Sequence, residues 1–94
     1  MFARVSTFGA STKQARETMS KGVPPEVRAL AGFRGAYALL DSKEGKAMLI
    51  TLWETEKDMQ SSLEVAQRVR GETAADAGAT APPVVETYEV LSQP

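Results

Sequence analysis

The chain has 94 residues, enough for one domain with a small core, and its 11 basic and 12 acidic side chains leave a net charge of −1. It contains no cysteine and no histidine, which excludes disulfides, thiolate nucleophiles, iron–sulfur clusters, Ser-His-Asp triads and imidazole ligation of a metal or haem. The balanced charge argues against nucleic-acid partners. Because there is neither a long apolar run nor a signal-peptide pattern, we expect a cytoplasmic protein without membrane partners.

The first third of the chain predicts a strand followed by two helical segments. Residues 2–8 are rich in aromatic and β-branched side chains and favour a strand. A helix is expected over residues 12–21, since Gly22 suits the position just past a helix end. Pro25 can then open a further helical turn over residues 26–30, because the first helical position needs no N–H donor.

The middle of the chain predicts a hairpin. Residues 33–41 and 47–54 have the composition of strands, and the polar segment 42–46 between them contains a glycine. Strand, short turn and strand therefore follow one another directly.

A second helix is expected after the hairpin. Thr55 begins a capping signature with acidic residues in the first turn, where the helix dipole favours them. One narrow apolar stripe follows, in which either Val69 or Arg70 is the last member. Gly71 either ends this helix or lies within it as it runs on toward Ala77. Residues 71–83 hold no large apolar side chain and are predicted to be a loose connector, and a last strand is expected over 84–91.

The element order is β-α-β-β-α-β, which is the ferredoxin-like arrangement. We therefore predict a single α+β domain over residues 1–94, with two helices covering one face of a four-stranded antiparallel sheet.

The other face of that sheet predicts a homodimer. A half-buried strand should alternate apolar and polar residues, yet strands 33–41 and 47–54 are largely apolar on both faces. Since the helices cover only one face, a second copy of the chain is the simplest cover for the other, and the two copies would enclose an apolar cavity. The alternative is that these apolar residues are simply exposed.

Two segments resemble a known family. Residues 32–41, GFRGAYALLD, and 45–55, GKAMLITLWET, are similar to the centre of the antibiotic-biosynthesis-monooxygenase-like family. The shared pattern is a glycine after the first helix, a strand, a hairpin, and a strand that ends in Trp, an acidic or polar residue and Ser or Thr. Residues 84–90 resemble the last strand of the family.

The resemblance implies a dimeric α+β barrel and, as one possible activity, a cofactor-independent monooxygenase. In that chemistry an electron-rich aromatic or polyketide-like substrate itself reduces O₂, so that no metal or organic cofactor is needed. The haem-degrading members of the family use a histidine, an asparagine and a further tryptophan, all of which are missing here, since Trp53 is the only tryptophan. The alternative is a non-catalytic ligand-binding or structural homodimer of the same fold. In either case the expected partners are a second copy of the chain and a small apolar or aromatic ligand.

The site candidates come from strand alternation and aromatic content. Phe2, Arg4, Ser6 and Phe8 share one face of the first strand, and the smaller Ala3, Val5 and Thr7 share the other. Because helices pack closely on small residues, we predict that the larger set faces a cavity between the open sheet face and the partner copy. Arg4 could stabilise a phenolate, and the rings of Tyr37 and Trp53 could contact an aromatic ligand.

Each of these side chains also has a structural interpretation. Arg4 could pair with Glu86 or Glu89 of the last strand, Tyr37 could lie in the core or dimer interface, and Trp53 could pack at the strand-to-helix corner. Four of the arginines outside the first strand are expected on the solvated surface: Arg28, Arg34, Arg68 and Arg70.

Overall fold

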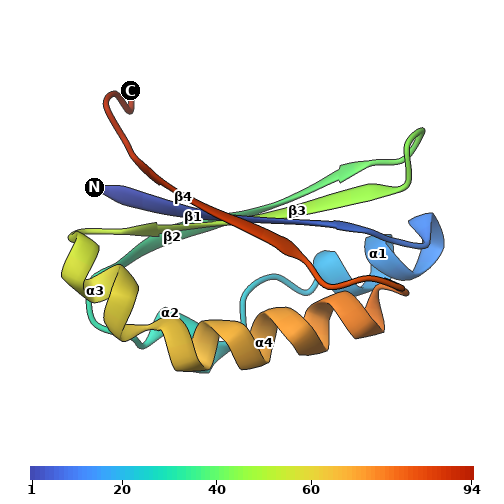
Figure 1. The fold of residues 1–94 in the computed structure, drawn as a ribbon, viewed down its shortest axis with the longest axis horizontal. Coiled ribbons are helices and arrows are strands. Elements are labelled where there is room, and N and C mark those ends of the chain that lie inside the picture. Colours follow the sequence, from blue (N-terminus) through green and yellow to red (C-terminus); the bar gives the residue numbers. More distant parts are fainter.

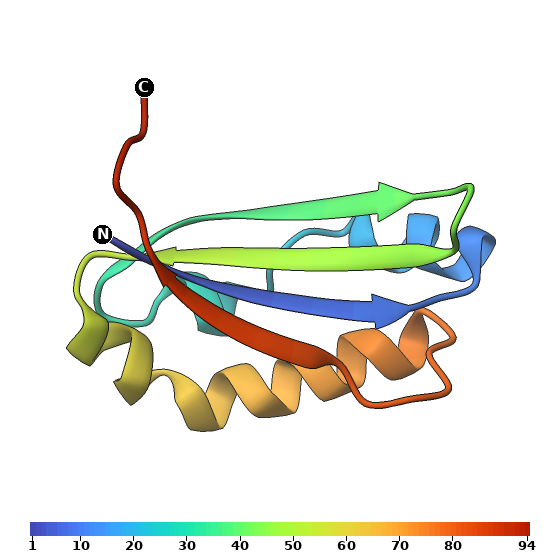
Figure 2. The same ribbon diagram turned by 45° about the horizontal axis from the view of Figure 1, so that its top comes forward.

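A computed structural model describes all 94 residues of the chain. In chain order the elements are β1 (Phe2–Gly9), α1 (Thr12–Met19), α2 (Pro25–Arg28), β2 (Phe33–Asp41), β3 (Lys46–Trp53), α3 (Glu56–Ser61), α4 (Leu63–Asp76) and β4 (Val84–Glu89). The strands form one antiparallel sheet in the order β2-β3-β1-β4 (Figure 2). The predicted ferredoxin-like βαββαβ fold is confirmed.

All four helices lie on the same side of the sheet, so the molecule has two layers (Figure 1). The other side of the sheet is bare apart from the last residues of the chain, which extend away from the helices (Figures 1 and 2). None of the helices combines the length and the apolar character that crossing a membrane would require.

The helical segment after β3 is divided at Ser62 into α3 and α4, a break that the sequence did not predict. Of the two alternatives at Gly71, the structure shows the second, since α4 continues through Gly71 to Asp76. The connector is therefore residues 77–83, and the prediction that it begins at residue 71 is wrong. Alanines are strong helix formers, and Ala74 and Ala77 are buried in the core, so packing holds the last turn of the helix in place.

The sheet face that carries Arg4 is the helix-covered one. Phe8 packs with Ala15 and Met19 of α1, and Arg4 bonds to the segment around Ser62. Strand alternation correctly grouped the side chains of β1, but the assignment of the larger group to the open face is wrong. The small residues that let the layers approach are supplied by the helices and by Ala47 of β3, not by β1.

Buried apolar side chains form two separate clusters at opposite ends of the sheet. One contains Phe8, Ala15, Met19, Ala47, Ala74 and Ala77. The other contains Val27, Trp53 and Met59. Phe8 pairs with Ala47 near one end of β1, and Phe2 pairs with Trp53 at the other end. The helix layer is thus anchored at both ends of the strands, and the middle of the sheet lies under neither cluster.

Candidate functional site: a cavity between the sheet and the helices

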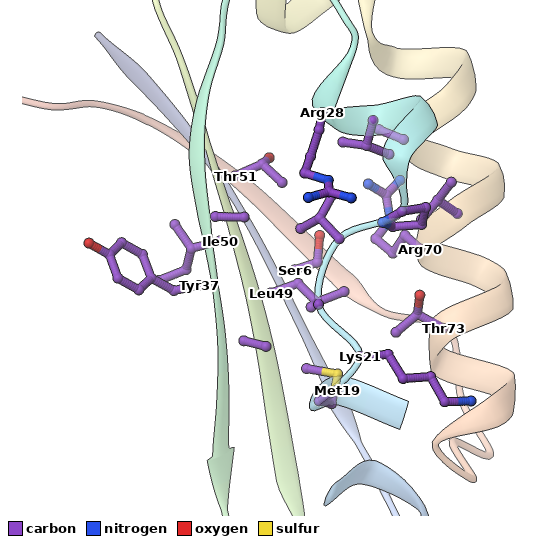
Figure 3. A pocket seen from close by; sticks show the side chains of 18 of the residues that line it. Ser6, Met19, Lys21, Arg28, Tyr37, Leu49, Ile50, Thr51, Arg70 and Thr73 are labelled. Carbon is purple, nitrogen blue, oxygen red and sulfur yellow. The ribbon is translucent and has the colours of Figure 1, made fainter. Parts of the chain in front are cut away.

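A cavity of about 480 Å³ lies between the middle of the sheet and the helices. Figure 3 shows side chains from β1 and β3 on one wall and from α2 and α4 on the other. The sheet contributes Arg4, Ser6, Ala36, Ala38, Leu49 and Thr51, and the helix layer contributes Met19, Val27, Arg28, Ala66, Val69, Arg70 and Thr73. Arg4 and Ser6, which were predicted to face a pocket between the open face and a partner copy, therefore line a cavity within one chain instead.

Arg4 is the most buried charged residue of the cavity wall, with 4% of its surface exposed. Its guanidinium donates to Ser62 Oγ at 3.0 Å and to the Met59 carbonyl at 2.6 Å, and it lies 6.0 Å from the centre of the Trp53 ring. No carboxylate forms an ion pair with it. Burial lowers the pKa of Arg4 from its ordinary value, and the positive charge of Arg70 lowers it further.

The break between α3 and α4 provides the two groups that hold Arg4. Thr55 caps α3 by accepting from the Asp58 N–H at 3.0 Å, as its capping signature predicts. One turn later Ser62 Oγ donates back to the Met59 carbonyl at 2.6 Å, a type of bond that bends helices. The same carbonyl accepts from Arg4. Sequence reasoning missed Ser62, because a serine within a helical pattern gives no sign that it binds a residue 58 positions earlier.

Two further arginines on the cavity wall were predicted to lie on the solvated surface. Arg28 is exposed, as predicted, and extends from α2 into the space between sheet and helices, whereas Arg70 is half-buried and faces that space from α4 (Figure 3). Neither takes part in a salt bridge. Burial lowers the pKa of Arg70. The sequence did carry a signal for Arg70, since it continues the apolar stripe of its helix, where an unpaired cation is unusual.

Arg34 and Arg68 are also exposed, as predicted. Arg34 pairs with Glu54, and Arg68 pairs with Glu26 at 2.6 Å.

The remaining predicted site residues divide between the cavity and other parts of the fold. Ser6 and Trp53 line the cavity, and Trp53 also fills the corner between β3 and α3, where its ring meets Phe33 edge-on and its Nε1 donates to Thr51 Oγ1 at 2.9 Å. Phe8 belongs to the core cluster and is not part of the cavity wall.

Tyr37 and the two glutamates of β4 do not meet Arg4. Tyr37 is among the residues that line the cavity, but its ring points away from it on the open face, and the residue is 57% exposed (Figure 3). Glu86 pairs in register with Val5 and so shares the open face, whereas Glu89 stands beside Phe2 at the end of the sheet. The predicted pairing of Arg4 with either glutamate is wrong, because strand adjacency does not place their carboxylates near its guanidinium.

No group of three or more acidic side chains that could hold a metal ion occurs in the structure. The cavity offers instead an apolar surface, a few hydroxyls, four cationic side chains and the carboxylates of Glu72 and Asp76.

Solved structures of oxygenases share this fold over nearly the full chain. One is the monooxygenase from the ActVA-Orf6 gene of Streptomyces coelicolor, solved in complex with nanaomycin D. The match covers 98% of the present chain and 88% of the monooxygenase, with 18% sequence identity and a TM-score of 0.76. It likewise matches SnoaB, a cofactor-independent oxygenase from Streptomyces nogalater, over 98% of this chain and 94% of that one, at 14% identity and a TM-score of 0.70. The chain has the antibiotic biosynthesis monooxygenase fold.

This fold does not by itself decide the chemistry. The haem degrader MhuD from Mycobacterium tuberculosis has it too, with 19% identity, a TM-score of 0.68 and coverage of 99% of this chain and 98% of that one. No protein-family model and no curated protein sequence matches the chain. The function must therefore be argued from the side chains of the cavity.

Proposed function

We propose that this protein binds a small aromatic or polyketide-like molecule in the cavity and oxidises it with O₂ as a cofactor-independent monooxygenase. The observation that carries the proposal is Arg4, a buried cation without a carboxylate partner on the wall of a largely apolar cavity. Burying a charge is costly unless it meets an opposite charge or strong hydrogen bonds. A ligand anion would supply the missing partner, and Trp53 beside it provides an aromatic surface.

The reaction needs the substrate as an anion. A phenol or enol such as the tautomer of an anthrone gives its proton to solvent, and the resulting oxyanion is stabilised by the guanidinium. The anion passes electrons to O₂, a carbon–oxygen bond forms, and the hydroperoxide so produced loses water to leave a ketone. The overall change is CH₂ + O₂ → C=O + H₂O, in which four electrons move from carbon to oxygen and no other reductant is required.

Oxygen consumption tests this proposal. Chelator-treated protein should consume one O₂ for each anthrone converted to its ketone, faster than buffer alone, and Arg4→Met should lower the rate by at least about tenfold, as expected for losing one charged donor at a developing anion. Arg16→Met, an exposed arginine of α1 outside the cavity, is the matched control. Oxygen uptake no faster than in buffer across a panel of anthrones and naphthols would overturn the proposal.

A ligand-binding protein without turnover is the second candidate. It is favoured by the chemistry around Arg4, where the ionisable side chain that shifts its pKa is another cation, Arg70, and no carboxylate forms an ion pair with it. Binding that quenches Trp53 fluorescence without oxygen uptake would establish this second function in place of the first.

We also propose that a second copy covers the open face of the sheet. This face exposes Tyr37, Leu39, Val84 and Tyr88, which retain between 46% and 63% of their surface. Contiguous apolar patches of this kind on a sheet usually mark an interface, and pairing two copies back to back would bury them.

Sedimentation tests the dimer. The wild type should sediment at about twice the chain mass of 10.1 kDa at micromolar concentration. Leu39→Glu should shift it to the monomer, whereas Leu63→Glu should not, because Leu63 is equally exposed at 44% but lies on α4. A wild-type monomer under these conditions would contradict the proposal.

A further inference from the structure

Four cationic side chains line the cavity: three are arginines, and the fourth is Lys21, which lies apart from Arg28 and Arg70 in Figure 3. Arg4, Arg28 and Arg70 all line the same space, and none of them forms a salt bridge. Figure 3 shows Arg28 and Arg70 approaching each other from α2 and α4. We call these three residues the arginine end of the cavity.

The acidic side chains near the cavity do not neutralise this end. Glu72 lies 3.5 Å from Arg68, which also binds Glu26 on the outer surface. Asp76 is the last residue of α4 and stands six positions after Arg70, about 9 Å farther along the helix. The arginine end therefore keeps an excess of positive charge.

The three arginines also have N–H groups that donate to no acceptor in the protein. A guanidinium carries five N–H groups, and Arg4 makes one bond to Ser62 and one to Met59. No fully buried side-chain nitrogen or oxygen in the structure lacks a partner, so the unbonded Nε of Arg4 keeps some accessible surface, and Arg4 lines the cavity. Arg28 and Arg70 make no side-chain hydrogen bond to the protein, as the bonds of the arginines involve only residues 4, 34 and 68.

We propose that the arginine end binds a carboxylate, so that the ligand of this cavity is an aromatic carboxylic acid and not a neutral aromatic compound. The inference rests on the proposed function, because it requires the cavity to be the ligand site. A carboxylate matches the planar fork of a guanidinium with two parallel hydrogen bonds. A single phenolate oxygen cannot occupy three guanidinium groups, whereas an acid with a phenol or enol has anionic groups for both Arg4 and the pair Arg28 and Arg70.

The repulsion between these cations supports the same conclusion. The charge of Arg70 disfavours the charged form of Arg4, and burial disfavours the charged form of both. Binding an anion removes this penalty, so part of the affinity for a carboxylate would come from relieving it.

Trp53 provides the assay, because it is the only tryptophan and lines the cavity. We would titrate the protein with 6-hydroxy-2-naphthoate, its methyl ester and 2-naphthyl phosphate, following Trp53 fluorescence. The acid should bind at least about tenfold more tightly than the ester at low salt, as expected for charge-assisted bonds. Raising the ionic strength should weaken the binding of the acid and leave the binding of the ester unchanged.

Two variants locate the effect. Arg28→Met and Arg70→Met should each lower the affinity for the acid by about tenfold and change the affinity for the ester by no more than about twofold. Arg16→Met, outside the cavity, should change neither.

The outcomes separate this inference from the proposed function. Equal affinity for acid and ester, tighter binding of the phosphate, or loss of acid binding in Arg16→Met would each overturn the carboxylate site, as would the failure of all three probes to bind. Selective binding of the acid without oxygen uptake would instead establish the carboxylate site and refute the monooxygenase.

Discussion

Replacing Arg4 by methionine removes the buried charge and keeps most of the volume of the side chain. Two hydrogen bonds are lost, to Ser62 Oγ and to the Met59 carbonyl. Those two groups are not left without partners, because Ser62 Oγ still donates to the Met59 carbonyl at 2.6 Å. The variant therefore avoids the penalty of an unsatisfied buried polar group.

The expected cost is moderate. Hydrogen bonds from charged donors contribute about 1.5–3 kcal/mol each, but the variant also removes a desolvated cation that Arg70 repels. We therefore expect the free energy of unfolding to fall by about 1–2 kcal/mol, below the roughly 3–5 kcal/mol typical of breaking a buried ion pair. In a domain of this size each kcal/mol corresponds to a Tm change of about 4–8 °C.

Urea unfolding followed by Trp53 fluorescence measures the change. Arg34→Met is the control, because it removes an exposed pair with Glu54 of the kind that contributes about 0–1 kcal/mol. A loss of 4 kcal/mol or more in Arg4→Met would instead indicate that Arg4 neutralises a buried carboxylate. Unchanged binding of 6-hydroxy-2-naphthoate in this variant would refute its place in the site.

Further predictions concern the segments around the cavity. Thr55→Ala removes the cap of α3 and should cost about 0.5–2 kcal/mol in urea unfolding; no change would mean that the cap is not formed in solution. Gly32→Ala should cost at least about 1 kcal/mol because φ is +79° there and the new Cβ would collide with a side chain of α3, whereas Gly71→Ala, with open space in α4, should stabilise the protein by about 0.5–1 kcal/mol; a reversed order would contradict the backbone assignment. In Arg68→Met the pKa of Glu26 should rise toward its ordinary value, because the hydrogen bond from Arg68 holds it down, and a carboxyl NMR titration that finds the same pKa in both proteins would exclude this pair.

The element order, the antiparallel sheet and the cap at Thr55 could be predicted from the sequence, because they depend on local patterns. Periodicity identified the strands, and Gly and Pro residues marked where helices stop. Low complexity was a poor guide to the end of α4, since Ala74 and Ala77 are good helix formers that become buried.

The side of the sheet on which the cavity lies could not be predicted. Alternation groups Arg4 with Ser6 and Phe8, but it does not say which group the helices cover. That choice depends on how far the helix layer stands from the sheet, which the two core clusters set at opposite ends of the strands. The sequence likewise did not predict that Arg28 and Arg70 line the cavity, because only the tertiary fold brings their helices over the middle of the sheet.

The location of a bound aromatic acid tests the central claim most directly. In crystals soaked with a brominated hydroxynaphthoate, the anomalous signal of bromine should appear between the sheet and α4, with the carboxylate within hydrogen-bonding distance of Arg28 or Arg70. A bromine signal on the open face beside Tyr37, with the cavity between sheet and helices free of ligand, would show that this cavity is not the ligand site.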